Sequence, residues 1–250
     1  MRPRLGVSFL RLFTVQGSYS YERMLGVGVG VAEEPLLRGL AGPGRSERNG
    51  AAYRAAVARG AHFFNAHPYL CGLAVGAAAR AEHDGASPEQ VERLRTALCG
   101  PLGSLGDRLV WAGWLPLTSA LALVGVALGC AWPAVLAFLV VYNLGHVALR
   151  WWALQAGWRY GTRVAEALRH PVLQRAAALS APAVALAAGA ALPIVAQYLG
   201  GPFPGWARLT LAATAVGGFG LLRWRGGALG GLRLGLGLVA AALVAGWAWR

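Results

Sequence analysis

Residues 109–149 read LVWAGWLPLTSALALVGVALGCAWPAVLAFLVVYNLGHVAL, a stretch that contains no Arg, Lys, Asp or Glu. One helix needs roughly 20 apolar residues to cross the hydrocarbon core of a bilayer, and this stretch is about twice that long. It predicts two spanning helices that turn near residues 130–133, where Trp132 suits the interface and Pro133 suits the first turn of the second helix. The fold class that follows is all-α and polytopic, with the lipid bilayer as solvent.

The composition of the whole chain agrees with a membrane protein. Hydrophobic residues make up 56% of the 250 residues, charged residues only 13%, and the mean hydropathy is +0.49. The formal net charge of +13 comes from Arg, because the chain has no Lys. These Arg residues lie between apolar runs rather than on one continuous basic face, so their spacing favours anchoring of helices at the cytoplasmic side over binding of nucleic acid.

Charge placement predicts the topology after the first two spans. Five Arg residues fall between 150 and 175, which predicts a cytoplasmic connection. A third span is expected over 176–199, and the uncharged link 200–205 is expected to face outward. Fourth and fifth spans are expected over 207–222 and 228–249, giving about five transmembrane spans in all.

The N-terminal part of the chain differs from the rest, because nine of the ten acidic residues precede Arg108. We therefore divide the chain into an amphipathic and re-entrant helical region, 1–108, and a transmembrane region, 109–250. The stretch 8–37 is expected to be a helix whose apolar stripe stops before Pro35. This helix is expected to lie on the membrane or to re-enter it.

A second N-terminal helix has a clear start signal. Ser87 is a good N-cap residue and Pro88 suits the first helical position, so a polar helix is expected from there through Ala97.

Polar residues in apolar surroundings are the candidates for function, since an unsatisfied polar group in hydrocarbon is costly. The first such cluster is QGSYSYERM at 16–24, whose amide, hydroxyls, acid and base suit hydrogen bonding to sugar hydroxyls. The alternative is an interfacial helix in which Glu22 and Arg23 are solvated.

The second cluster is HFFNAHPY at 62–69. Pro68 disfavours helical geometry at His67, and a broken helix at membrane depth is tolerated where it lines a cavity. Asn65 is a candidate ligand amide, or else it caps the next helix. His62 and His67 are five residues apart, which does not match the four-residue spacing of a helical metal pair.

Two further clusters lie near the two ends of the uncharged stretch 109–149. Asp107 follows the Gly-rich stretch GPLGSLG at 100–106, and it is either a helix N-cap or a polar element of a translocation pathway. Asn143 lies a turn or two inside the membrane, in YNLGH at 142–146. The run Arg150-Trp151-Trp152 that follows is interpreted as an interfacial anchor.

The sequence contains no combination of nucleophile, base and orienting group, and no HExxH or GxSxG motif, so we expect no catalytic residue. The three Cys residues lack CxxC spacing, and neither a metal nor another cofactor is indicated.

Four strings, taken together, resemble the IID subunit of the mannose/fructose/sorbose-family phosphotransferase system (PTS). They are QGSYSYERM at 16–24, HFFNAHPYL at 62–70, GPLGSLGD at 100–107 and YNLGHVALRWW at 142–152. The similarity covers about Phe9 to Gly161. It departs from the family pattern at Leu115 and His146, where Arg is common in the family.

The resemblance implies a non-catalytic membrane subunit that pairs with a IIC subunit in a hetero-oligomer and shares a hexose site with it. Cytoplasmic IIA and IIB components would phosphorylate the sugar on entry through the bacterial inner membrane. The candidate substrate-binding residues are Gln16, Glu22, Asn65, His67, Asp107 and Asn143. The alternative is a scaffold or regulatory remnant that does not transport, and the sequence does not identify the sugar.

Overall fold

The structure is a computed structural model that describes residues 4–41 and 50–201. All regular elements in these ranges are helical, which confirms the predicted all-α class. Three helical runs in the described residues are long and apolar enough to cross a membrane: Pro88–Ala127, Ala131–Arg163 and Pro171–Val195. The chain is therefore a helical membrane protein. The expected fourth and fifth spans lie outside the described residues.

The contacts within the chain divide it into two units, 1–191 and 192–250. The description below concerns the first unit, from which the last described helix continues to Gly200. The division expected at residue 108 stays a prediction, and the boundary falls inside the continuous helical run from Pro88 to Ala127.

The chain begins with α1 (Leu5–Arg11), a 3₁₀ turn η1 (Leu12–Thr14) and α2 (Gly26–Leu37). The single helix expected over residues 8–37 is thus wrong, because the chain turns between η1 and α2. Backbone hydrogen bonds close this turn, with the amide of Met24 donating to the carbonyl of Ser20 at 2.7 Å.

The expected helix end before Pro35 is also wrong, since this residue lies inside α2. A proline has no N–H to donate to the carbonyl four residues earlier, here that of Val31. Arg11 of α1 replaces the missing donor, because its Nη1 donates to the carbonyl oxygen of Val31 at 2.9 Å. A tertiary contact therefore stabilises a helix that, by local sequence rules, would end before Pro35.

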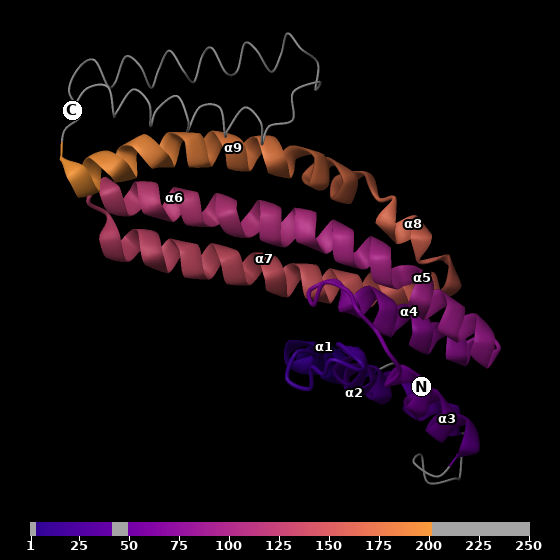
Figure 1. The fold of residues 1–250 in the computed structure, drawn as a ribbon. Coiled ribbons are helices and arrows are strands. Elements are labelled where there is room, and N and C mark those ends of the chain that lie inside the picture. The colour runs from indigo at the N-terminus through magenta and orange to yellow at the C-terminus, as the bar shows by residue number, and fades with distance from the viewer. Residues whose placement is uncertain (1–3, 42–49, 202–250) are drawn as a thin grey trace. The chain divides into compact units, whose positions relative to one another are not determined.

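The remaining elements follow in chain order, and Figure 1 shows their arrangement. They are η2 (Arg38–Ala41), α3 (Ala51–Gly60), α4 (Cys71–His83), α5 (Pro88–Gly106), the π-helix η3 (Asp107–Trp114), α6 (Leu115–Ala127), α7 (Ala131–Tyr160), η4 (Gly161–Arg163), α8 (Ala165–Leu168) and α9 (Pro171–Gly200).

The predicted hairpin is confirmed: α6 and α7 pack against each other and are joined by a tight turn, with Pro133 in the first turn of α7.

The start of α5 is as predicted and its end is not. The Ser87 hydroxyl accepts a hydrogen bond from the amide of Gln90, and the Gln90 side chain accepts one from the amide of Ser87, which together form a capping box. The helix continues past the expected end at Ala97, through Pro101, into η3 and α6. It thereby joins a polar N-terminal segment to the first apolar span.

The core is centred on α4, in which every residue from Cys71 to Ala79 is buried. It packs most closely against α7, where a Cβ added at Gly76 would lie 2.4 Å from the backbone nitrogen of Trp158. A Cβ at Gly157 would likewise lie 2.3 Å from the carbonyl oxygen of Leu73. Only glycine permits this backbone approach, which is the small-residue packing typical of membrane helices.

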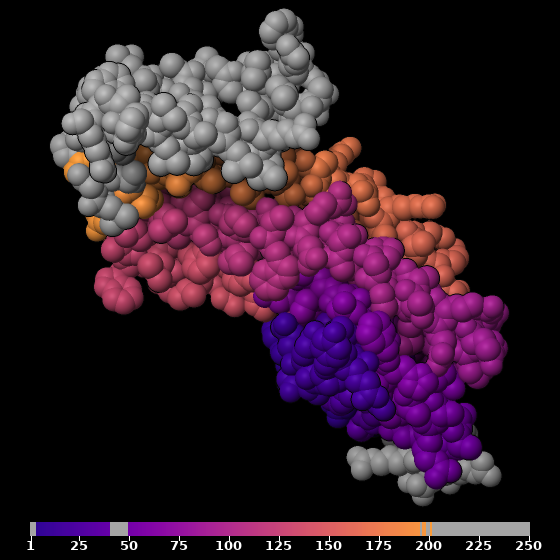
Figure 2. Space-filling view, in the orientation of Figure 1, coloured from indigo at the N-terminus to yellow at the C-terminus, as the bar shows by residue number. Residues whose placement is uncertain are grey.

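The N-terminal segments are fastened to the long helices by a buried ion pair. Glu33 of α2 accepts a hydrogen bond from Nη1 of Arg95 at 2.8 Å, and Nη2 of Arg95 donates to the carbonyl of Gly60 at 2.7 Å. Burial raises the pKa of Glu33 to about 7, against the lowering effect of Arg95. Figure 2 shows the N-terminal segments, indigo to purple, in continuous contact with the purple and magenta surface of the following helices.

Candidate functional site

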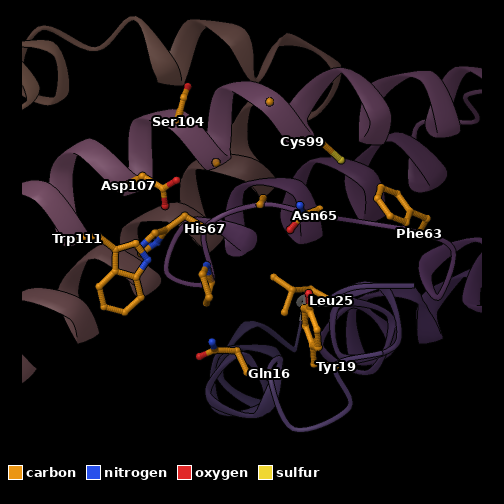
Figure 3. A pocket seen from close by; sticks show the side chains of 14 residues that line it. Gln16, Tyr19, Leu25, Phe63, Asn65, His67, Cys99, Ser104, Asp107 and Trp111 are labelled. Carbon is orange, nitrogen blue, oxygen red and sulfur yellow. The ribbon is translucent and has the colours of Figure 1, made fainter. Parts of the chain in front are cut away.

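A pocket of about 640 Å³ lies between three segments of the chain. Its walls come from the turn between η1 and α2, the connection between α3 and α4, and the junction of α5 with η3. Figure 3 shows Gln16 and Tyr19 on one side, Ser104 and Asp107 on the opposite side, and Asn65 and His67 between them. The lining residues are Gln16, Tyr19, Leu25, Phe63, Asn65, Ala66, His67, Pro68, Cys99, Gly100, Gly103, Ser104, Asp107 and Trp111.

The structure brings four of the six candidate residues to this pocket: Gln16, Asn65, His67 and Asp107. They are separated by up to 91 residues in the sequence, and each comes from one of the strings that carry the family resemblance. The pocket therefore combines amide, imidazole, carboxylate and hydroxyl groups with apolar and aromatic residues, a combination that small-molecule sites share.

Glu22 and Asn143 do not line the pocket. Glu22 is exposed on the turn after η1. The Asn143 amide nitrogen donates to the carbonyl of Leu139 at 2.6 Å, and its Oδ1 lies 3.0 Å from Nε2 of His146. Both side chains are separate from the polar group around Gln16 and Asn65, and a role for either in substrate binding stays a prediction.

The connection between α3 and α4 is non-helical, as Pro68 predicted. Backbone hydrogen bonds join it to the segment before α2: the amide of Leu25 donates to the carbonyl of Phe64 at 2.9 Å, and the amide of Phe64 donates to the carbonyl of Arg23 at 3.3 Å. Asn65 does not cap the next helix, because the N-cap of α4 is Leu70. Its amide is therefore available to the pocket.

His67 is almost fully buried beside the pocket. Burial lowers its pKa to about 4, with Asp107 opposing and Arg150 adding to the effect, so the ring is neutral at pH 7. Its Nδ1 accepts a hydrogen bond from the amide of Tyr69 at 3.2 Å, which places the proton on Nε2. Nε2 has no partner among the described residues. The pocket wall thus contains an uncharged imidazole with an unused donor.

Asp107 is not a helix N-cap, because helical residues continue on both sides of it. It begins the π-helix η3, and Trp111 lies four residues later on the same face. Both side chains line the pocket. π-Helical turns within long helices occur frequently at functional sites, because they change the direction in which successive side chains point.

Sequence reasoning missed the aromatic side of the pocket. Trp111 lies with its ring centroid 5.1 Å from that of His67 and 6.0 Å from that of Tyr69, and Tyr19 and Phe63 are also exposed at the pocket. Their positions in the sequence could have indicated these aromatic residues, since Tyr19 and Phe63 fall within the polar strings. Trp111 follows the third string at one helical turn from Asp107.

The interpretation of Arg150 as part of an interfacial anchor is wrong, because only 4% of this residue is exposed. Its side chain points inward, where its Nη1 donates to the carbonyl of Leu12 at 2.5 Å. No local pattern indicates this contact, which joins residues 138 apart in the sequence.

The two histidines of the second string are in different environments. The Nδ1 of His62 lies 2.6 Å from Oε1 of Glu92 on α5, at the surface, whereas His67 lies at the pocket. Within residues 4–41 and 50–201, no three His, Cys, Asp or Glu side chains gather as metal ligands would.

Comparison with known proteins places the chain in a family. Residues 3–189 match the family described as "PTS system mannose/fructose/sorbose family IID component". The chain is 33% identical over 176 residues to the sorbose-specific EIID component of Klebsiella pneumoniae, which covers 67% of this chain and 60% of the relative. It is 27% identical over 172 residues to the mannose-specific EIID component of Escherichia coli, covering 67% of this chain and 59% of that protein.

Solved structures agree on the fold. A cryo-EM structure that contains the mannose transporter ManYZ is similar with a TM-score of 0.57 at 21% identity, over 98% of this chain and 95% of the other. A second structure, described as a membrane protein, has a TM-score of 0.64 at the same identity and coverage. The aligned region spans about 60% of the length of the first two curated relatives. On the evidence of the match over residues 3–189, the chain belongs to the mannose/fructose/sorbose family of PTS IID components.

Proposed function

We propose that this chain is the IID subunit of a sugar permease and that, with a IIC subunit, it forms the binding and translocation pathway for a hexose. The observation that carries the proposal is the convergence of Gln16, Asn65 and Asp107, from three distant segments, on one pocket in a chain of this family. The relatives are named for sorbose, mannose and fructose, so the substrate is proposed to be a sugar of this kind.

The chemistry of the pocket supports a neutral, polyhydroxylated ligand. The amides of Gln16 and Asn65 each offer both donors and acceptors, the carboxylate of Asp107 offers acceptors, and the ring of His67 adds no charge. Trp111 and Tyr19 provide flat apolar surfaces beside these groups. A sugar presents hydroxyls around its edge and apolar C–H groups on its faces, which this combination complements.

The proposed cellular setting is the inner membrane of a bacterium, which the chain crosses several times. Cytoplasmic IIA and IIB components would supply the phosphoryl group, and this chain would contribute to the binding site without donating phosphate.

A regulatory or scaffolding subunit is the second candidate, and two replacements favour it. His146 occupies a position where the family commonly has Arg, and its ring stacks on Tyr69 at a centroid distance of 4.9 Å. Leu115 also replaces a common Arg. If these replacements removed transport, the chain would still assemble with IIC but would not support sugar phosphorylation.

Replacement of Asn65 by Leu tests the proposal. We expect the N65L variant to insert and to assemble with IIC, but to lose sugar uptake, because an apolar side chain of similar size removes a donor and an acceptor from the pocket. The measurement is phosphorylation of labelled mannose, fructose and sorbose by membranes that contain IIC, supplemented with IIA, IIB and the general phosphoryl carriers. Gln155→Leu is the control, since this amide is exposed on α7 away from the pocket.

Three outcomes would contradict parts of the proposal. Wild-type activity of N65L would show that the pocket does not take part in sugar uptake. A complete mixture that phosphorylates no hexose with the wild-type chain would favour the regulatory candidate, and Leu115→Arg with His146→Arg would then be the first reversions to measure. Phosphate found on the isolated chain would contradict its role as a subunit that donates no phosphate.

A further inference from the structure

Arg150 reaches from the middle of α7 into the interior of the N-terminal region. Its Nη1 lies within hydrogen-bond distance of two backbone carbonyls, 2.5 Å from that of Leu12 and 3.3 Å from that of Pro68. Leu12 begins the segment that leads to Gln16, and Pro68 ends the segment that contains Asn65 and His67. One guanidinium nitrogen therefore contacts both of the segments that contribute Gln16 and Asn65 to the pocket.

The flat faces of the same guanidinium contact aromatic rings from the same two segments. Its carbon lies 5.1 Å from the ring centroid of Phe13 and 4.5 Å from that of Tyr69. Such cation–π contacts are stronger where water is excluded, and only 4% of Arg150 is exposed. None of the ion pairs in the described part of the chain includes Arg150, so carbonyls and rings stabilise its charge in place of a carboxylate.

The two segments are also joined at a second place. There the backbone itself makes the connection, through the hydrogen bonds of Phe64 with Arg23 and Leu25. In the first segment Gln16 lies between Leu12 and Arg23, and in the second Asn65 and His67 lie between Phe64 and Pro68. The pocket residues are thus placed between a backbone connection on one side and Arg150 on the other.

We propose that Arg150 is a positioning residue that holds the Gln16 segment and the Asn65–His67 segment at a fixed separation. It does not touch the ligand, since it does not line the pocket. Without the guanidinium the segments stay joined at Phe64 but separate at Leu12 and Pro68. Small displacements of binding groups have large effects on recognition, so the position of this side chain controls the affinity of the pocket.

Backbone hydrogen–deuterium exchange of the full chain in lipid nanodiscs tests the positioning role without any sugar. In Arg150→Gln we expect the amides of residues 12–19 and those of Ala66, His67, Tyr69 and Leu70 to exchange on the order of ten- to hundredfold faster, the size expected for loss of hydrogen bonds to a charged donor. The amides of Phe64 and Leu25 should change little, because their bonds do not involve Arg150. Arg159→Gln is the matched control, an exposed Arg of the same helix.

Unchanged exchange in both segments of R150Q would overturn the proposal, whatever the sugar measurements give. If R150Q does not accumulate, Arg150→Lys replaces it, because lysine keeps the charge but has no planar group to lie between Phe13 and Tyr69. The same two segments should then exchange faster, by a smaller factor. A lysine variant identical to the wild type in both segments would also overturn the proposal.

The consequence for affinity rests on the proposed function. In complexes with IIC, R150Q should weaken hexose binding on the order of ten- to hundredfold while the amount of IIC that copurifies stays the same. Faster exchange in R150Q, with no hexose binding by the wild-type complex, would support the positioning role and contradict the proposed function. Faster exchange with unaltered hexose affinity would overturn the link between Arg150 and the pocket.

Discussion

The side chain of His67 lies against a helix that has no Cβ at the point of contact. A Cβ added at Gly106 would lie 2.2 Å from the Cβ of His67 and 2.3 Å from its Cγ, distances at which one of the two residues must move. Because His67 is almost fully buried, its side chain has little space in which to rearrange. The shape of the pocket near Asp107 therefore depends on a glycine that is not itself part of the lining.

Gly106→Ala should consequently displace His67 and lower the affinity of the pocket. Forcing an extra methyl group into a packed interior costs about 1–3 kcal/mol, and the affected ring forms part of the pocket wall. We expect lower thermal stability together with weaker hexose binding in the complex with IIC. The measurements are the unfolding midpoint in detergent and the hexose Kd.

Gly189→Ala provides the comparison, since a Cβ at this exposed helical position of α9 would meet no atom within 4 Å. Alanine is the better helix former by roughly 1 kcal/mol, so this variant should be as stable as the wild type or more stable. If Gly106→Ala behaved like Gly189→Ala in both measurements, the close packing of His67 on α5 would be disproved.

At the scale of elements, Glu34 connects α2 to its neighbours. Its carboxylate accepts hydrogen bonds from Arg11 of α1 at 2.7 Å, from Arg38 of η2 at 2.7 and 2.9 Å, and from the hydroxyl of Tyr53 of α3 at 2.6 Å. Burial alone would raise the pKa of this carboxyl, but the bonds from Arg38, Tyr53 and Arg11 outweigh it and lower the pKa to about 2. The ionised form therefore stabilises the arrangement of four elements.

This shift makes the stability of the N-terminal elements depend on pH. A carboxyl whose pKa is lower in the folded state than its ordinary value of 4.5 stabilises fully above that value, and the contribution is lost as the pH falls toward 2. The contribution at neutral pH is on the order of 3 kcal/mol. We expect Glu34→Gln to lower the unfolding midpoint at pH 7 and to flatten its dependence between pH 4.5 and pH 2.

Glu166→Gln is the control for this measurement, because its carboxylate is exposed and 3.6 Å from Arg163 on its own short segment. It should leave the pH profile of the unfolding midpoint close to that of the wild type. A Glu34→Gln profile that still falls as steeply as the wild-type profile over the same range would show that Glu34 does not connect these elements.

Which elements could be predicted depended on whether their determinants are local. The start of α5 is encoded in four adjacent residues, and the turn before α7 follows from the length of an uncharged stretch and one proline. The break after η1 and the continuation of α2 through Pro35 depend on distant partners instead. Arg11 supplies a donor to Val31, and a Cβ at Gly28 would lie 2.2 Å from the carbonyl oxygen of Val15.

For the molecule as a whole, the same distinction applies to the candidate site. Gln16, Asn65, His67 and Asp107 could be singled out because each is a polar residue in an apolar string, and the structure places all four at one pocket. Asn143 satisfies the same criterion, yet its amide bonds to its own helix at Leu139. Polarity in the sequence thus identifies residues that need partners, and the tertiary fold decides whether those partners are local or in a shared pocket.

The positions of Arg residues relative to the long helices predict an orientation of the chain in the membrane. Helix α7 leads from the uncharged turn at 128–130 to an end that carries Arg159 and Arg163, and α9 leads away from the Arg-rich connection toward Gly200. Arg-rich connections are retained at the cytoplasmic side. The turn before α7 and the end of α9 should therefore both face outward.

Cys130 provides a natural probe of this orientation, because it is exposed in the turn before α7, whereas Cys71 is buried. A membrane-impermeant maleimide added to intact cells should label Cys130 in a variant in which Cys99, which lines the pocket, is replaced by Ala. An Arg163→Cys variant in which the native cysteines are replaced by Ala should react only after the membrane is permeabilised, since η4 lies at the opposite end of α7. A Gly201→Cys variant in the same background should react in intact cells. Labelling of Arg163→Cys from outside, with Cys130 protected, would reverse the orientation and place the Arg-rich connection on the side opposite to the proposed IIA and IIB components.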